Sequence, residues 1–199
     1  SLAKAAAELG VLRTATWIMP ASDELSYAEN FAFHVARLKP AAAVLAEHGI
    51  RFGLEYVGPK TSWASRKHSF AHTMEQMLEL CQAIGENMGF LLDSWHWYTS
   101  HETVEDLRGL RVEQVVDVHV NDAPAGVAVD EQVDNVRDLP GVTGVIDIAD
   151  FLGALQAIGY EGPVMVEPFS QRVRELEREE AVATTAAALG QVWEQAGLV

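Results

Sequence analysis

Short apolar runs alternate with long helical patterns along this chain. The runs are rich in β-branched and aromatic residues, as buried strands are, and each is followed by a loop and a helical stretch. This alternation is typical of an α/β fold with a parallel sheet. The predicted strands are residues 12–19, 52–57, 90–93, 115–120 and 164–167.

Apolar residues spaced three and four apart predict the helices. Phe31, Val35 and Leu38, for example, begin a stripe along one face of a helix over residues 25–48. Asp147 is suited to cap a short helix that runs to Ile158. The same pattern predicts further helices over residues 66–87, 102–110 and 174–196.

Five strand and helix units fit either an open doubly wound sheet or part of a (β/α)₈ TIM barrel. An eight-unit barrel needs about 250 residues, so a barrel here would lack roughly three units at the front. The chain has 199 residues and begins with Ser1, which permits that reading. We expect one domain over residues 1–199, as a fragment or the ordered part of a longer protein.

Composition narrows the classes of function. Hydrophobic residues make up 49% of the chain, enough for a sizeable core, and the net charge is −15, which disfavours nucleic acid and anionic membranes as partners. No apolar run approaches the roughly 20 residues that span a bilayer. The single cysteine, Cys81, cannot form an internal disulfide, and the N-terminus has no signal-peptide pattern. These features predict a cytoplasmic protein.

Four predicted strands carry one possible metal ligand each at the carboxyl end. These residues are Glu55, Asp93, His119 and Glu167. Because the carboxyl ends of parallel strands meet at one edge, the four side chains are expected to converge. One such residue alone is better explained as a solvated acid or a hydrogen-bonded histidine, but four in series favour a metal site. Three carboxylates and one imidazole suit Mn²⁺ best, with Mg²⁺, Co²⁺ or Zn²⁺ as alternatives.

The blocks around these residues resemble a known family. They are similar to the sugar phosphate isomerase/epimerase group, the xylose isomerase-like TIM barrels that include ketose 3-epimerases and inosose dehydratases. The resemblance runs from about Leu12 to the C-terminus and implies a barrel of which this chain carries strands 4 to 8. The matching blocks are residues 53–55 (GLE), 92–96 (LDSWH), 118–122 (VHVND), 139–141 (LPG) and 159–169 (GYEGPVMVEPF).

The resemblance also implies roles for individual residues. It identifies the four strand-end residues as the metal ligands, with Glu55 and Glu167 also acting as the catalytic acid and base. His96 and Arg137 correspond to the residues that contact substrate. The segment 123–135, which lies before Arg137, is longer than the family pattern.

Two further residues are candidates for contact with substrate. Trp95 has an aromatic ring suited to wall a sugar pocket, although packing in the core is the commoner role of a tryptophan. Lys60 follows the Gly58-Pro59 turn and is placed to meet a hydroxyl or a phosphate, although a loop lysine is more often simply solvated.

The implied activity is isomerisation or epimerisation of a sugar or sugar phosphate. A proton next to a carbonyl would move through an enediolate, with help from a divalent cation. An inosose-type dehydratase using the same site and a non-catalytic sugar-binding fragment remain as alternatives. An abasic-site endonuclease would need a basic surface, which the net charge of −15 disfavours. The expected partner is a small sugar, and assembly into a homo-oligomer is left open.

Overall fold

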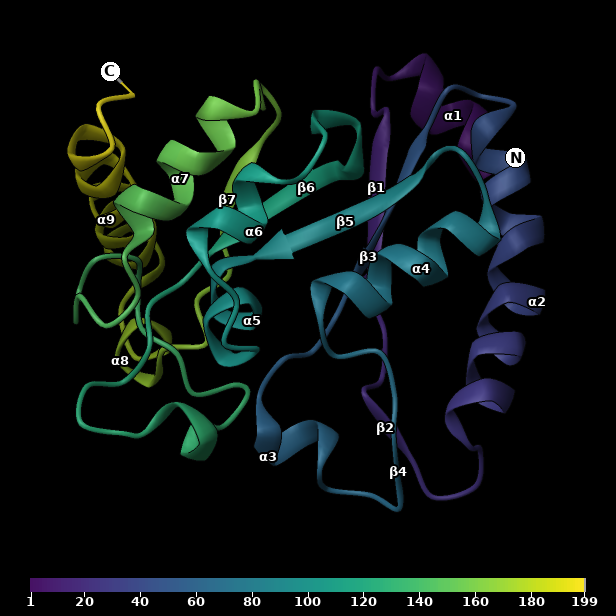
Figure 1. The fold of residues 1–199 in the computed structure, drawn as a ribbon. Coiled ribbons are helices and arrows are strands. Elements are labelled where there is room, and N and C mark those ends of the chain that lie inside the picture. Colours follow the sequence, from purple (N-terminus) through teal and green to yellow (C-terminus); the bar gives the residue numbers. More distant parts are fainter. Residues whose placement is uncertain (199) are drawn as a thin grey trace.

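The computed structural model describes residues 1–198 and contains a five-stranded parallel sheet that curves into a half-barrel (Figure 1). Every neighbouring pair of strands in this sheet is parallel, which confirms the predicted α/β class and the predicted strand count. Within the described residues, β1 and β7 are the two edges. In spatial order the strands are β1 (Arg13–Trp17), β3 (Arg51–Glu55), β5 (Met88–Asp93), β6 (Val115–Val120) and β7 (Val164–Val166).

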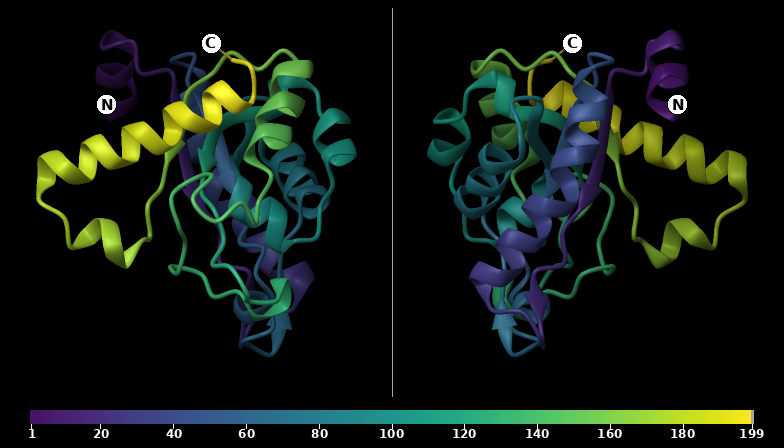
Figure 2. Two further views of the ribbon diagram at one scale, coloured as in Figure 1. Left: turned by 90° about the vertical axis from the view of Figure 1, so that its left-hand side faces the viewer. Right: turned by 90° about the vertical axis from the view of Figure 1, so that its right-hand side faces the viewer.

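Helices pack against the sheet in two groups. The first group lies over β3 and β5, and the second lies beyond β6 and β7 (Figure 1). Within the second group, α9 extends sideways from the body of the molecule in both views of Figure 2. The first group is α2 (Tyr27–Ala46) and α4 (Met74–Ile84), the second is α6 (Val104–Arg108), α7 (Ile148–Ala157) and α9 (Arg178–Gln195), and α1 (Leu2–Glu8) precedes the sheet.

The main core lies between the helices and the sheet. Met77 and Leu80 of α4 are completely buried in one apolar cluster with Phe90 and Leu92 of β5 and Phe151 of α7. Full burial of a side chain of this size stabilises the fold by about 1.5–3 kcal/mol. This packing sets the strands in register, so that their carboxyl ends lie at one edge.

Short elements cover that carboxyl edge, at the bottom of Figure 1. Two of them, β2 and β4, pair antiparallel in a small ribbon. The short elements at this edge are β2 (Ala21–Ser22), α3 (Lys60–Trp63), β4 (His68–Ser69), α5 (Ser94–Thr99), η2 (Val129–Glu131) and α8 (Gln171–Arg174), whereas η1 (Val112–Gln114) lies at the opposite edge, directly before β6.

The helix predicted over residues 66–87 is wrong in its first third. His68 and Ser69 belong to the β2–β4 ribbon, and α4 begins only at Met74. The Thr73 side chain accepts a hydrogen bond from the backbone N–H of Gln76 at 3.4 Å, which caps the helix there. Pairing with a distant strand and this cap outweigh the helical spacing of the apolar residues.

The last predicted helix, over residues 174–196, forms as α9 but begins four residues later, at Arg178, and Arg174 instead ends the short helix α8. Helix α5 was not predicted at all. It forms from the aromatic sequence SWHWYT because its tryptophans are buried and Asp93 caps it.

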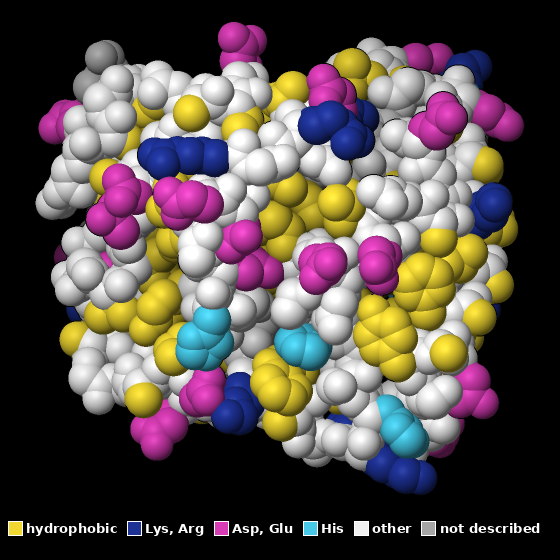
Figure 3. Space-filling model, in the orientation of Figure 1, with side chains coloured by type: hydrophobic (Ala, Val, Ile, Leu, Met, Phe, Trp, Pro, Cys, Tyr) yellow, Lys and Arg dark blue, Asp and Glu magenta, His cyan; other side chains and the backbone are white. Residues whose placement is uncertain are grey.

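The surface carries many acidic side chains, in agreement with the net charge of −15. Acidic side chains are spread over the face drawn in Figure 3, with lysines and arginines between them. Within residues 1–198, no helix has both the length and the apolar character to cross a bilayer.

Gly89 provides a test of the tight contact between β5 and the segment before β6. A methyl group at this position would lie 2.5 Å from the Gln114 carbonyl oxygen, which belongs to the backbone and cannot move easily. Gly89→Ala is therefore expected to lower the free energy of unfolding by about 1–3 kcal/mol in urea denaturation.

The matched control is Gly190→Ala. Gly190 lies inside α9, and a methyl group there would have no atom within 4 Å. This control should gain about 0.5–1 kcal/mol, because alanine favours the helix. Equal effects of the two substitutions would contradict the proposed close approach at Gly89.

Candidate metal centre and active site

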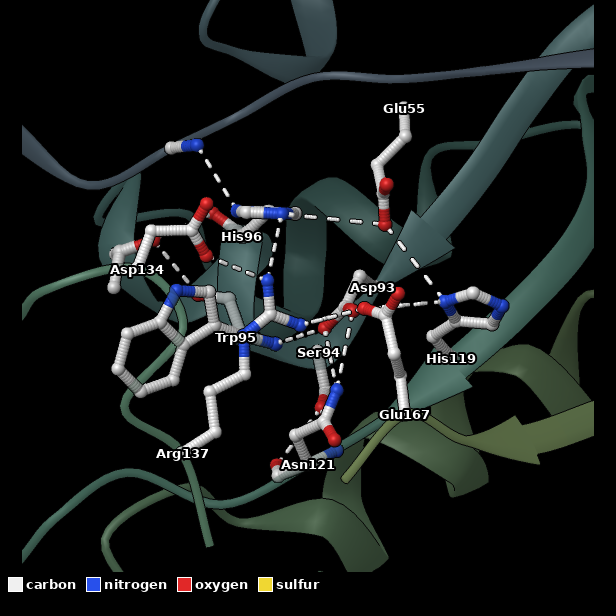
Figure 4. Close-up of polar contacts among 12 residues, drawn as sticks. Glu55, Asp93, Ser94, Trp95, His96, His119, Asn121, Asp134, Arg137 and Glu167 are labelled. Atoms are coloured by element: carbon white, nitrogen blue, oxygen red, sulfur yellow. Dashed lines mark hydrogen bonds and ion pairs between the residues drawn. The ribbon is translucent and has the colours of Figure 1, made fainter. Parts of the chain in front are cut away.

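The carboxyl edge of the sheet brings Glu55, Asp93, His119 and Glu167 together (Figure 4). Glu55 and Asp93 are the last residues of β3 and β5, His119 lies near the end of β6, and Glu167 directly follows β7. The strand register places Asp93 beside His119. One possible ligand atom from each of the four residues lies within 4.8 Å of the others.

The imidazole of His119 lies among the three carboxylates. Its Nδ1 atom is 3.8 Å from Glu55 Oε1, 3.9 Å from Asp93 Oδ2 and 3.7 Å from Glu167 Oε2. These distances are too long for hydrogen bonds. Among the described residues, neither His119 Nδ1 nor Glu55 Oε1 has a hydrogen-bond partner, although both atoms are buried.

Buried polar atoms without partners are costly, at about 1–3 kcal/mol each. A cation between these atoms would satisfy both of them. Three carboxylates and one imidazole are also the donor set that oxygen-preferring divalent ions take. The residues present therefore fit a divalent metal ion, as the sequence predicted from their positions.

The two glutamates of the site have pKa values that are shifted in opposite directions. Burial, together with the negative charges of Asp93 and Glu167, raises the pKa of Glu55 to about 9. Burial acts in the same direction on Glu167, but His119 and Arg137 outweigh it and lower the pKa of Glu167. Without a metal, Glu55 is thus held protonated and Glu167 ionised near neutral pH.

Arg137 is the buried positive charge of this site. Its Nη1 atom donates to Asp93 Oδ2 at 2.9 Å and to Glu167 Oε2 at 3.0 Å. The guanidinium carbon lies 5.4 Å from the ring centre of Trp95 and 4.8 Å from that of Phe169. Two ion pairs and two aromatic faces therefore hold the guanidinium against the candidate metal ligands.

The backbone around Arg137 is also held. Asp122 and Asp138 exchange two backbone hydrogen bonds, at 2.9 and 2.8 Å, and so tie the end of β6 to the residue after Arg137. The Asp122 carboxylate accepts hydrogen bonds from the backbone N–H groups of Gly144 and Ile146 at 2.7 and 3.0 Å. The loop after Arg137 is anchored through its backbone in this way.

His96 faces Arg137 from the first turn of α5. Burial, followed by the charge of Arg137, lowers the pKa of His96 to about 3, so the ring is neutral near pH 7. Its Nδ1 lies 3.2 Å from the backbone N–H of Gly58 and its Nε2 lies 3.2 Å from Nη2 of Arg137, and both of these neighbours are donors. A neutral imidazole accepts at one ring nitrogen and donates from the other, so it can accept only one of the two hydrogen bonds. The polar edges of His96 and Arg137 thus lie side by side at the edge of the site.

A cavity of about 270 Å³ opens beside these groups. Its polar lining comes from Glu55, His96, Asp134, Arg137 and Glu167, and its apolar lining includes Trp17, Val57 and Phe169. Larger hollows occur elsewhere on the surface, for example one of about 520 Å³ between α4 and η1, and the four candidate metal ligands do not line it. The smaller cavity is therefore the candidate active site, because candidate metal ligands line it.

Two predicted contact residues lie outside the cavity lining. Trp95 is completely buried and packs on the guanidinium of Arg137. Lys60 lies on α3 at the surface, where it forms an ion pair with Asp130 at 2.7 Å. Neither residue reaches the cavity in this structure, so we assign neither a direct contact with substrate.

Sequence reasoning overlooked Asp134. This residue lines the cavity, and its Oδ1 accepts a hydrogen bond from Arg137 Nη2 at 2.8 Å. The signal available in the sequence was that Asp134 stands three residues before Arg137. Asp134 lies within the segment 123–135, which is longer than the family pattern, so no motif pointed to this residue.

Comparison with known proteins identifies relatives. A family model described as "Xylose isomerase-like TIM barrel" matches residues 1–191. The inosose isomerase of Bacillus subtilis is 30% identical over 141 residues, which cover 69% of this chain and 46% of that protein. The 3-dehydroshikimate dehydratase of Pseudomonas aeruginosa is 31% identical over 77% of this chain and 23% of that protein. The chain spans about half the length of the inosose isomerases it matches.

Solved structures show the same fold. A xylose isomerase domain protein from Alicyclobacillus acidocaldarius aligns with a TM-score of 0.84 and 31% identity, covering 96% of this chain and 67% of that one. The IolI protein, crystallised with a zinc atom, aligns with a TM-score of 0.81 and 24% identity, covering 98% of this chain and 67% of that one.

The raised pKa of Glu55 predicts how stability changes with pH. The folded-state value of about 9 lies above the roughly 4.3 of an unfolded glutamate. Protonation therefore favours the folded state, which loses stability as pH rises between these two values. Glu55→Gln removes this loss, so in chelator its unfolding free energy should exceed that of the wild type increasingly from about pH 5 to about pH 9.

Urea denaturation across this pH range measures the difference. Glu161→Gln, a change at an exposed acid outside the site, should follow the wild-type profile. Parallel profiles for wild type and Glu55→Gln would show that burial does not perturb Glu55.

Proposed function

Because the chain belongs to the xylose isomerase-like TIM barrel family, we propose that it carries the metal and proton-transfer site of a sugar isomerase or epimerase. The substrate would be a small polyhydroxy ketone, and the proton that moves would be on a carbon next to the carbonyl. The observation that carries this proposal is the convergence of Glu55, Asp93, His119 and Glu167 beside a cavity that fits a small molecule.

Those four residues would hold the cation. We propose Mn²⁺ first, with Mg²⁺, Co²⁺ or Zn²⁺ as alternatives, because the donor set is three carboxylates and one imidazole. A bound divalent ion supplies Lewis-acid stabilisation of negative charge on a carbonyl oxygen, worth several kcal/mol.

The two glutamates would move the proton. They come from β3 and the end of β7, and so approach the cavity from different strands. The opposite pKa shifts of the two glutamates belong to the metal-free site, and with the cation bound both would be ionised ligands. We propose that one glutamate removes the proton and that the other returns one to the opposite face.

His96 and Arg137 would hold the substrate. Nε2 of His96 and Nη2 of Arg137 lie 3.2 Å apart, both residues line the cavity, and they are suited to bind one ketone or hydroxyl oxygen. The low pKa of His96 keeps its ring neutral. These two groups would orient the carbon that loses its proton toward the two glutamates.

A lyase is the second candidate. The same base could remove the proton and a β-hydroxyl could then leave as water, which gives a dehydratase. The 31% identity to the 3-dehydroshikimate dehydratase of Pseudomonas aeruginosa supports a dehydratase as this second candidate.

Metal binding is the first test. The chain freed of metal with chelator should bind Mn²⁺ in isothermal titration calorimetry. His119→Gln removes the imidazole that lies among the carboxylates and should weaken the affinity at least about tenfold. Glu161→Gln should bind as the wild type does, and unchanged affinity in His119→Gln would remove His119 from the site.

Proton transfer is the second test. An inosose incubated in D₂O with the Mn²⁺-loaded chain should exchange hydrogen for deuterium next to its carbonyl, as followed by NMR. Glu55→Gln and Glu167→Gln should each slow the exchange by about 10²- to 10⁴-fold, because each removes one acid or base group.

The products distinguish the candidates. Exchange with retention of all hydroxyls indicates an isomerase or epimerase, and an unsaturated or deoxy ketone indicates a dehydratase. Chelation should abolish the exchange, and added Mn²⁺ should restore it. Exchange at the full rate in both Glu55→Gln and Glu167→Gln would overturn the assignment of the two glutamates as acid and base.

A further inference from the structure

The segment 123–135 is a folded wall of the cavity and not a loose loop. Gln132 is buried, and its Nε2 atom donates to the carbonyl oxygens of Pro124 and Val127 at 3.3 and 3.1 Å, which closes the segment on itself. Thr61 of α3 donates to the carbonyl of Gln132 at 2.7 Å. Contacts from inside and outside the segment therefore hold its backbone in place.

Two polar contacts of Asp130 at the surface also hold the segment in place. Asp130 accepts from Lys60 Nζ at 2.7 Å and lies 2.8 Å from His101 Nε2. Both partners come from elements that flank the mouth of the cavity, α3 and the end of α5. The ion pair with Asp130 also holds the ammonium group of Lys60 outside the cavity, away from a bound substrate.

The anchored segment presents Asp134 to the cavity. The next residue, Asn135, has a backbone φ of 66°, a left-handed conformation that asparagine tolerates better than most residues. Asp134 lines the cavity with a side chain that is 26% exposed, and it bonds to Arg137 at 2.8 Å (Figure 4). Its carboxylate is thus a fixed feature of the wall.

The charges around the cavity do not balance. Four carboxylates, those of Glu55, Asp93, Asp134 and Glu167, surround the single guanidinium of Arg137. With all four ionised, even a divalent cation would leave one negative charge in excess. At the low dielectric of a buried site, an anionic group on a ligand would be repelled.

Arg137 has little left with which to attract such a group. Both hydrogens of Nη1 are used by Asp93 and Glu167, and one hydrogen of Nη2 is used by Asp134. Two N–H groups remain: one on Nη2, which lies 3.2 Å from His96 Nε2, and the one on Nε, which is buried and has no partner among the described residues. A carboxylate or phosphate that needs one N–H from each Nη therefore finds no such pair free.

From this geometry we infer that Asp134 is a specificity-determining residue, which makes the cavity accept uncharged polyhydroxy ketones and reject ketones that carry a carboxylate or a phosphate. Its carboxylate would accept hydrogen bonds from ligand hydroxyls and would keep Arg137 from pairing with an anion. This inference rests on the proposed function, since it concerns the substrate of the same site.

Binding, not turnover, tests the inference. The affinity of the Mn²⁺-loaded chain is measured by calorimetry for two cyclic ketones, an uncharged inosose and 3-dehydroshikimate, which carries a carboxylate. The wild type should bind the inosose more tightly. Asp134→Asn keeps the size of the side chain but removes its charge and weakens its pairing with Arg137, so the affinity ratio should shift toward 3-dehydroshikimate at least about tenfold.

The control is Glu131→Gln, which makes the same change of charge in the same segment. Glu131 is exposed and does not line the cavity, so the ratio should stay within about twofold of the wild type. An unchanged ratio in Asp134→Asn, tighter binding of 3-dehydroshikimate by the wild type, or binding of neither ketone would overturn the inference. Selective binding without any deuterium exchange would instead contradict the proposed function and leave the role of Asp134 standing.

Discussion

Carboxylates gathered in a buried site need positive charge beside them, and this requirement organises the carboxyl edge of the sheet. Taking each ion out of water costs several kcal/mol, and removing one partner of a buried pair costs about 3–5 kcal/mol. Arg137 meets part of the requirement through Asp93, Glu167 and Asp134. The remainder falls on Glu55, which is protonated in the absence of a cation.

The surrounding loops serve the same requirement. The guanidinium can pair with three carboxylates only if its backbone is fixed, and Asp122 fixes it through the bridge to Asp138. Trp95 then covers one part of the guanidinium and Phe169 another. The same contacts that stabilise Arg137 also limit its free N–H groups. Structural stability and ligand preference therefore have one physical origin here.

Elements with a local signal were predictable. Helix α2 was expected over 25–48 and spans Tyr27–Ala46, because its apolar stripe and its cap lie within the segment itself. Elements that depend on distant partners were not predictable. The ribbon of β2 and β4 forms only when residues 21–22 and 68–69 meet, and α5 forms because its tryptophans are buried by other parts of the chain.

For the candidate site, the sequence by itself determined which side chains converge. Each possible ligand ends an apolar run, and parallel strands must bring such ends to one edge, so the convergence of Glu55, Asp93, His119 and Glu167 follows from local pattern alone. Only the tertiary structure decided what surrounds them. The neighbours of His96, the bonds of Arg137 and the place of Asp134 depend on contacts between different segments of the chain, and no local pattern encodes those distances.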